Sequence, residues 1–149
     1  MNKIKNRDVA ALYQALTSKD VGEVKKSPES RKFLYAIQRN IPRVKEVVTA
    51  VDDLLREFAA DQSRIMRESE SDGIMREKLA ELSREYSGAL DAHAATMEDE
   101  VEDLDLHMVD YEAVPDGISF GSVIALGPMI REPKDAQEGN NDPKEHVET

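Results

Sequence analysis

The residues whose types and spacing could do chemistry lie in a short stretch near the middle of the second half of the chain. Asp103, Asp105 and His107 alternate there with apolar residues. In a β-strand alternate side chains share one face, so two carboxylates and an imidazole would project together. Such a set can bind a divalent metal ion, which makes these three residues the candidate ligands of a metal site. The competing interpretation is the solvent face of an edge strand, charged against aggregation.

Two charged clusters are the candidates for an interaction site. They consist of the acidic Glu98, Asp99, Glu100 and Glu102 and the basic Arg39, Arg43 and Lys45. A dense acidic surface can imitate the phosphates of a nucleic acid and occupy the basic site of another protein. A basic surface can bind nucleic acid itself, but a net charge of −11 and few interleaved aromatic residues disfavour nucleic acid as a partner.

Other signatures of catalysis are absent from the sequence. It has no cysteine, which excludes disulfides, thiolate metal sites and a cysteine nucleophile. Nucleophile elbows, glycine-rich phosphate loops, paired-histidine zinc motifs and calcium loops are also missing. His93 lies on an apolar helix face, where a partly buried structural histidine is the commoner outcome. The sequence therefore predicts a non-enzymatic protein without a cofactor, and a metal-dependent enzyme is the alternative.

The charged residues must be positioned by two long stretches that each carry a seam, meaning a row of apolar residues along one helix face. Both alternate steps of three and four residues, a period of about 3.5 that keeps one helix face on a partner helix. The Ser27-Pro28 pair is typical of a helix start and predicts that the first of two long helices begins there. This helix is expected to reach residue 65 or 66, with a kink at Pro42. The seams comprise Leu34, Ile37, Ile41, Val44, Val48, Val51, Leu55 and Phe58, and then Met75, Leu79, Leu82, Tyr86, Ala89, His93 and Met97.

The second long helix is expected over residues 74–102, after a polar turn at 68–73. A short connection makes the two helices antiparallel neighbours, with residue 45 opposite residue 95 and residue 32 opposite residue 108. Residues 1–67 carry a net charge of +5 and residues 68–149 a net charge of −16. We interpret this asymmetry as a basic stretch, residues 25–45, that lies beside the acidic residues of 98–105 and selects the register. Those acidic residues are Glu98, Asp99, Glu100, Glu102, Asp103 and Asp105. Each exposed pair contributes only ~0.2–1 kcal/mol, so the seams must dominate stability.

Shorter elements flank the predicted hairpin. Residues 3–5 are expected to form a short strand that pairs with a strand at 104–108. A helix capped by Asn6 is expected to reach about residue 18, followed by a polar connection at 19–26. Ser119 is expected to cap a last helix, which the Gly127-Pro128 pair must disturb.

The predicted fold class is therefore mainly α: a long antiparallel, coiled-coil-like helical hairpin with short flanking helices and a minor two-stranded β element. Residues 1–130 are expected to form one domain, and residues 131–149 a disordered acidic tail. Aromatic residues make up 5% and Trp is absent, so the core must be thin and association with copies or with another protein would add burial. No apolar run approaches the roughly 18 residues of a membrane span.

The ordered set of motifs resembles a family of small proteins of tailed bacteriophages and prophages that has no assigned function. The resemblance covers most of residues 3–130, and the residues that carry it are Lys3-Ile4-Lys5-Asn6, Leu12-Tyr13, Leu16, Phe33-Leu34-Tyr35-Ala36-Ile37-Gln38-Arg39-Asn40, Leu104-Asp105-Leu106-His107, Val114-Pro115 and Met129-Ile130. The acidic tail and the length of the hairpin around residues 60–75 depart from the family pattern. The resemblance implies a phage origin and a fold, but no activity and no functional residues.

The resulting hypothesis is a non-enzymatic phage-encoded interaction or adaptor protein that acts through helical surfaces. Its role would be in assembly, in the virion or as an accessory protein, and its partner would be another protein or further copies of itself. It is expected in the cytoplasm of an infected bacterial host or associated with the virion. The alternative is an acidic, nucleic-acid-mimicking inhibitor of a host defence or replication protein.

Overall fold

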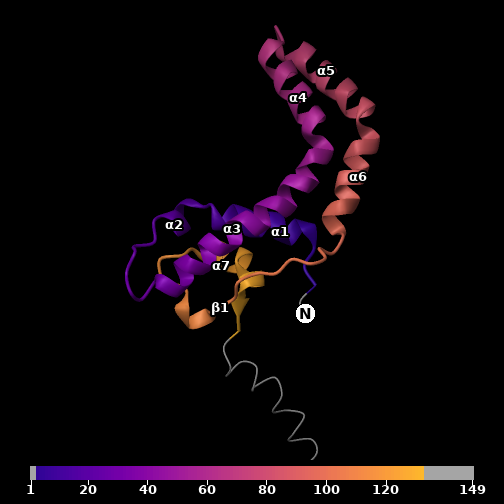
Figure 1. Cartoon of the computed structure of the whole chain (residues 1–149). Helices are drawn as coiled ribbons and strands as arrows, with labels where there is room; N and C mark the ends of the chain where they lie inside the picture. Colours follow the sequence, from indigo (N-terminus) through magenta and orange to yellow (C-terminus); the bar gives the residue numbers. More distant parts are fainter. Residues whose placement is uncertain (1–2, 133–149) are drawn as a thin grey trace, which may run out of the picture.

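A computed structural model describes residues 3–132 and consists of a folded base from which a helical arm projects (Figure 1). The base, residues 3–52 and 99–132, contains α1 (Asn6–Leu16), α2 (Lys19–Gly22), α3 (Arg31–Asp52), β1 (Val109–Asp110), η2 (Tyr111–Ala113), α7 (Phe120–Ala125), η3 (Gly127–Met129) and β2 (Ile130–Arg131). The arm, residues 53–98, contains η1 (Asp53–Leu55), α4 (Arg56–Glu68), α5 (Asp72–Glu85) and α6 (Ser87–Glu98). Within residues 3–132, no helix combines the length and the apolar character that crossing a membrane requires.

The hydrophobic core lies in the base. Spacings of three and four residues place Val9, Leu12 and Leu16 on one face of α1, and this face packs on α3. Further apolar residues close the core from the other side, where the chain returns through β1, α7 and η3. The buried cluster comprises Val9, Leu12, Ala15, Leu16, Val21, Phe33, Ala36, Ile37, Val44, Val109, Ile118, Leu126 and Met129.

The interior of the arm is a single row of contacts between its outgoing part, η1 and α4, and its returning part, α5 and α6. Within residues 53–98, all of which the structure describes, Leu82 is the one side chain that is buried. The ring of Phe58 meets the ring of Tyr86 edge to face, with centroids 5.5 Å apart. The Tyr86 hydroxyl donates a hydrogen bond of 2.9 Å to Asp61, and this bond raises the pKa of Tyr86. Within the arm the two predicted seams therefore face each other, but no further layer covers them. The earlier part of the first seam, with Ile37 and Val44, lies in the core of the base, where α3 packs on α1.

The predicted antiparallel hairpin is confirmed, although its helices are interrupted at unexpected places. α3 continues through Pro42, which is exposed and costs the helix one backbone N–H. The interruption lies instead at η1, and the returning helix is divided at Tyr86 into α5 and α6. The turn is where the sequence predicts it, and Ser71 caps α5 by accepting a hydrogen bond from the Ile74 N–H at 3.3 Å.

Several predicted boundaries in the base are wrong. α3 begins at Arg31, because Ser27 and Ser30 hydrogen-bond to each other in a turn that precedes it. The stretch at 19–26 contains the short helix α2, whose Val21 is buried in the core. Lys5 rather than Asn6 occupies the N-cap position of α1, and the Asn6 side chain is used elsewhere.

The strand predicted at 104–108 does not form. Asp103 has a left-handed φ of 61°, and the chain that follows is irregular as far as Met108. The sheet is instead a parallel pair in which Val109 of β1 is opposite Ile130 of β2. Residues 3–5 find a different partner, because Lys5 forms a single antiparallel bridge with Glu100.

The last helix, α7, is capped by Ser119 as predicted, through a hydrogen bond of 3.2 Å from the Ser122 N–H. It ends at Ala125, before Gly127 and Pro128. Asp20 of α2 ties this cap to the rest of the base by accepting hydrogen bonds from the Ser119 N–H at 2.9 Å and from the Ser18 hydroxyl at 2.6 Å. Arg131, at the predicted start of the acidic tail, belongs to β2, and residues 133–149 lie outside the described residues.

Candidate functional site

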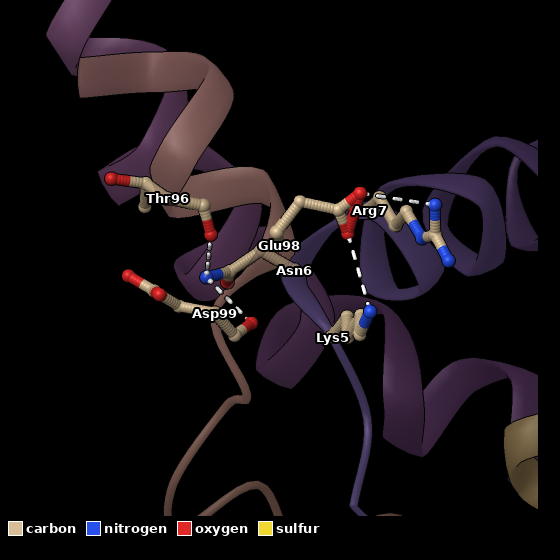
Figure 2. Close-up of polar contacts among 6 residues, drawn as sticks. All are labelled: Lys5, Asn6, Arg7, Thr96, Glu98 and Asp99. Atoms are coloured by element: carbon tan, nitrogen blue, oxygen red, sulfur yellow. Dashed lines mark hydrogen bonds and ion pairs between the residues drawn. The ribbon is translucent and has the colours of Figure 1, made fainter. Parts of the chain in front are cut away.

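The acidic cluster begins at the joint between the arm and the base (Figure 2). Glu98, the last residue of α6, lies between two cations of α1 and its N-cap, at 3.4 Å from Lys5 and 3.2 Å from Arg7. The Asn6 side-chain amide donates to the backbone oxygen of Thr96 at 2.8 Å. Carbonyls at the end of a helix lack partners within the helix, so Asn6 satisfies one of them and the two cations complement the negative helix end.

The side chains of the remaining acids of the cluster are not paired at this joint. Asp99, Glu100 and Glu102 are exposed, and among residues 3–132 their carboxylates form no ion pair. The cluster therefore has one member that holds the fold together and three that face solvent.

The predicted pairing of the basic stretch with the acidic residues of 98–105 is correct at one point, which lies just after the acidic cluster. Arg43 of α3 lies 3.9 Å from the Asp105 carboxylate and donates a hydrogen bond of 2.6 Å to the Asp105 backbone oxygen. Lys45 is exposed and, within the described part of the chain, forms no ion pair. Glu98 pairs with α1 instead of α3, because α6 ends there and the following chain runs beside residues 4–6.

The buried Asn40 holds the chain segment that the sequence predicts as a strand. Its Oδ1 accepts a hydrogen bond from the His107 N–H at 2.7 Å, and its Nδ2 donates to the His107 backbone oxygen at 3.0 Å. The same Nδ2 lies 3.4 Å from the Met129 sulfur. A single side chain thus supplies both bonds that a neighbouring strand would supply. Sequence reasoning does not assign this role to Asn40, although one signal is present: an asparagine on the core-facing stripe of an amphipathic helix, between Ile37 and Val44.

The structure does not bring the metal candidates together. Asp103 adopts the left-handed conformation, Asp105 pairs with Arg43, and the His107 ring packs edge to face on Tyr35 at 5.1 Å. In the stretch from Lys3 to Glu132, no three His, Asp or Glu side chains are grouped as a metal site would require. The correction follows from the missing strand, since the shared face existed only in that geometry. His93 is half-buried on the seam, as expected of a structural histidine.

Comparisons with known proteins add no relative. No family model, no curated protein and no solved structure matches this chain. The surfaces of the molecule itself therefore have to indicate its function, and the phage resemblance stays a prediction from the motifs.

Tyr35 lies beside two hollows of the surface. The residue is 51% exposed, and both hollows are lined by Tyr35 and Arg31. One hollow, of about 690 Å³, is bordered by Lys32, His107 and Arg131 among others, and the other, of about 550 Å³, is mainly apolar. The Arg39 guanidinium lies 5.9 Å from the centroid of the Tyr35 ring. The predicted basic residue Arg39 therefore borders this surface by stacking on Tyr35.

Large apolar side chains are exposed on two further surfaces. On the arm these are Leu54, Met66 and Ile74, of which Met66 is 58% exposed. On α7, Phe120 is 80% exposed and Ile124 is 62% exposed, because the opposite side of this short helix packs on the core. A contiguous group of exposed apolar side chains is typical of surfaces that bind other proteins, whereas single ones are ordinary. Helical periodicity could not separate Phe120 and Ile124 from the core-facing residues of α7, whereas Leu54, Met66 and Ile74 lie off the predicted seams.

Proposed function

We propose that this chain is a non-enzymatic, phage-encoded interaction protein that binds another protein through the outer faces of its arm. The observation that carries the proposal is the exposure of the arm, in which Leu82 is the one buried side chain of residues 53–98. Isolated helices are marginal in water, and a single seam adds little to them. Contact with a partner would bury the exposed Leu54, Met66 and Ile74 and so stabilise both molecules.

The phage origin and the place of action follow from the sequence motifs and are part of the proposal. The partner is a phage or host protein in the cytoplasm of the infected cell, or a component of the virion. The position of the gene narrows the role, since tail or capsid genes beside it favour assembly and early genes favour modulation of the host.

Site-directed photo-cross-linking tests the proposal. The full-length chain carries a photo-reactive amino acid in place of Met66 on the arm, or in place of the exposed polar Gln14 on α1 as a matched control. We expect a defined cross-linked species in infected cells from position 66, reduced when Ile74→Glu is added, and none from position 14. A monomer by light scattering that gives no specific cross-link at position 66 would contradict the proposal.

One observation keeps the acidic inhibitor as a second candidate. Asp99, Glu100 and Glu102 are exposed and, within residues 3–132, unpaired, so they retain the charge that phosphate mimicry needs. Glu98 is already used by Lys5 and Arg7, which favours a structural role for that residue.

A double charge reversal separates the two functions. Glu100→Lys combined with Glu102→Lys leaves Glu98 in place, so the joint and the circular dichroism spectrum should be preserved. The inhibitor hypothesis expects this variant to lose its ability to displace DNA from a host DNA-binding protein. If the chain instead binds its partner through the arm, the same double variant should give unchanged cross-linking from position 66.

A further inference from the structure

An apolar groove lies between α2 and α3 in the base, at some distance along the chain from the arm. We call it the α2–α3 groove, and its apolar lining consists of Leu16, Val21, Val24, Leu34, Ile37 and Ile41. The hollow measures about 550 Å³, enough to take several side chains of a partner. Leu16, Val21 and Ile37 belong to the core and form the buried floor of the groove, while Val24, Leu34 and Ile41 are half-buried. A second helix can therefore pack against Leu34 and Ile41 of α3.

The border of the groove is basic. Lys26 and Arg31 line it, and no Asp or Glu does. Among the described residues neither cation forms an ion pair. Of the charges next to the groove, Lys25, Lys32 and Glu29 are likewise exposed and unpaired, whereas Glu23 pairs with Lys19, so the surplus at the border is positive. An occupant that complements this border must place carboxylates beside its apolar side chains.

Tyr35 at the edge of the groove is held in place before any partner arrives. His107 packs edge to face on its ring, and the Arg39 guanidinium lies over its face. Tyrosine and arginine dominate the residues that contribute most to protein interfaces, and a side chain that is already ordered loses less entropy on binding.

We propose that the α2–α3 groove is the docking site for an acidic amphipathic helix of a partner protein. This inference rests on the proposed function, because it names the chemistry of a partner. Residues 133–149 of the chain would supply carboxylates but contain a single branched aliphatic residue, Val147, too few to fill the apolar lining. A partner helix instead offers apolar residues at positions i, i+3, i+4 and i+7, with Glu or Asp on the flanks.

Binding of a designed probe to the full-length chain tests the inference. The probe is a dye-labelled helical peptide with leucine on one face and glutamate on its flanks, and the matched control replaces every glutamate by lysine. We expect the glutamate peptide to bind about tenfold more tightly, with an affinity that falls as salt is added. Equal affinity for the two peptides, or no saturation by either up to about 1 mM, would overturn the inference.

Substitutions locate the binding. Arg31→Glu and Tyr35→Ala change exposed residues and should each weaken the glutamate peptide about tenfold. Arg76→Glu is the matched control, because Arg76 is also an exposed cation and lies on α5 of the arm. Similar losses from Arg31→Glu and Arg76→Glu would reveal non-specific attraction and overturn the inference.

Light scattering, which measures the oligomeric state, tests whether a second copy of the chain occupies the groove. If the chain is a dimer that Tyr35→Ala converts to a monomer, a second copy fills the groove and the inference is wrong. If the peptide does not bind but the cross-link at position 66 is intact, the groove inference is wrong and the proposed function of the arm stands. If the peptide binds but position 66 gives no cross-link, the arm is not the interaction surface and the groove inference is supported.

Discussion

Phe33 and Phe58 lie on consecutive stretches of helix, one in the base and one in the arm, and their surroundings differ. Phe33 of α3 is fully buried, since α1 and the returning chain cover it. Phe58 of α4 is half-buried, and Tyr86 is its aromatic neighbour across the seam. Both helices are amphipathic, so the number of layers that cover a helix decides how much apolar surface is removed from water. Figure 1 shows this contrast as a layered base and a projecting pair of helices.

Truncation of these two phenylalanines should give the largest difference between the regions. Phe33→Ala leaves a cavity in a closed core and should lower the free energy of unfolding by about 3–5 kcal/mol. Phe58→Ala removes a side chain that water already reaches and should lower it by about 1–2 kcal/mol. Urea denaturation followed by circular dichroism measures both values. Similar losses for the two variants would mean that the arm is as closely packed as the base.

Substitution of Asn40 should have the next largest effect. Asn40→Ala leaves the backbone N–H and carbonyl of His107 without their partners inside the base, at a cost of about 2–3 kcal/mol. Asn6→Ala at the half-exposed joint is the matched control and should cost about 1 kcal/mol. Limited proteolysis should then cut the Asn40→Ala protein within residues 103–108. Unchanged protease resistance there would show that other contacts hold this segment.

The base should be sensitive to acid through Asp20. Hydrogen bonds from the Ser18 hydroxyl and the Ser119 N–H hold the pKa of Asp20 below its usual range. A folded pKa below the unfolded one adds stability that is complete above the unfolded pKa, near 4, and is lost as the pH falls through the folded pKa. Denaturation midpoints between about pH 5 and pH 2 should therefore fall less steeply in Asp20→Asn than in the wild type. Parallel pH profiles would show that Asp20 is not the group involved.

The arm should be sensitive to alkali through Tyr86. Its hydrogen bond to Asp61 raises the pKa of Tyr86, so the folded state holds the phenolic proton more tightly than the unfolded state. Stability from this bond is complete below the unfolded pKa, near 10, and is lost as the pH rises through the folded pKa. Tyr86→Phe removes the titrating group and should flatten this part of the profile. A spectrophotometric titration in which Tyr86 ionises like a free tyrosine would contradict the prediction.

The ion pairs at the joint should contribute least. Glu98→Gln removes the charge that Lys5 and Arg7 share, and because all three side chains are partly exposed the loss should be ~0.2–1 kcal/mol. The difference from wild type should vanish in about 1 M salt, where the screening length is a few ångströms. A loss that persists in high salt would mean that Glu98 acts through packing.

The sequence predicts the hairpin well because the apolar spacing of the seams repeats over many helical turns. Over so many repeats, a single exceptional residue does not change the predicted helix. It fails where a single residue decides the structure. The alternation of Leu104, Leu106 and Met108 is typical of a strand, yet Asp103 and the side chain of Asn40 fix an irregular path instead. Asn40 could not be assigned from the sequence, because its partner lies 67 residues away.

The candidate site was predicted in part. The charge asymmetry pointed to contacts between the two halves, and Arg43 with Asp105 is one of them. The choice of Lys5 and Arg7 as partners of Glu98 depends on where α6 ends, and the sequence predicted that end four residues too late. Exposed apolar residues such as Phe120 follow the same spacing as buried ones, so only the fold separates them.

Native-state hydrogen exchange, resolved residue by residue, tests the contrast between the regions most directly. Opening the arm breaks one seam, whereas opening the base disrupts the whole core. The amides of α1 and of α3 up to Val44 should therefore exchange far more slowly than those of α4 and α5. Equal protection in α3 and α4 would contradict the account, because base and arm would then unfold as one cooperative unit.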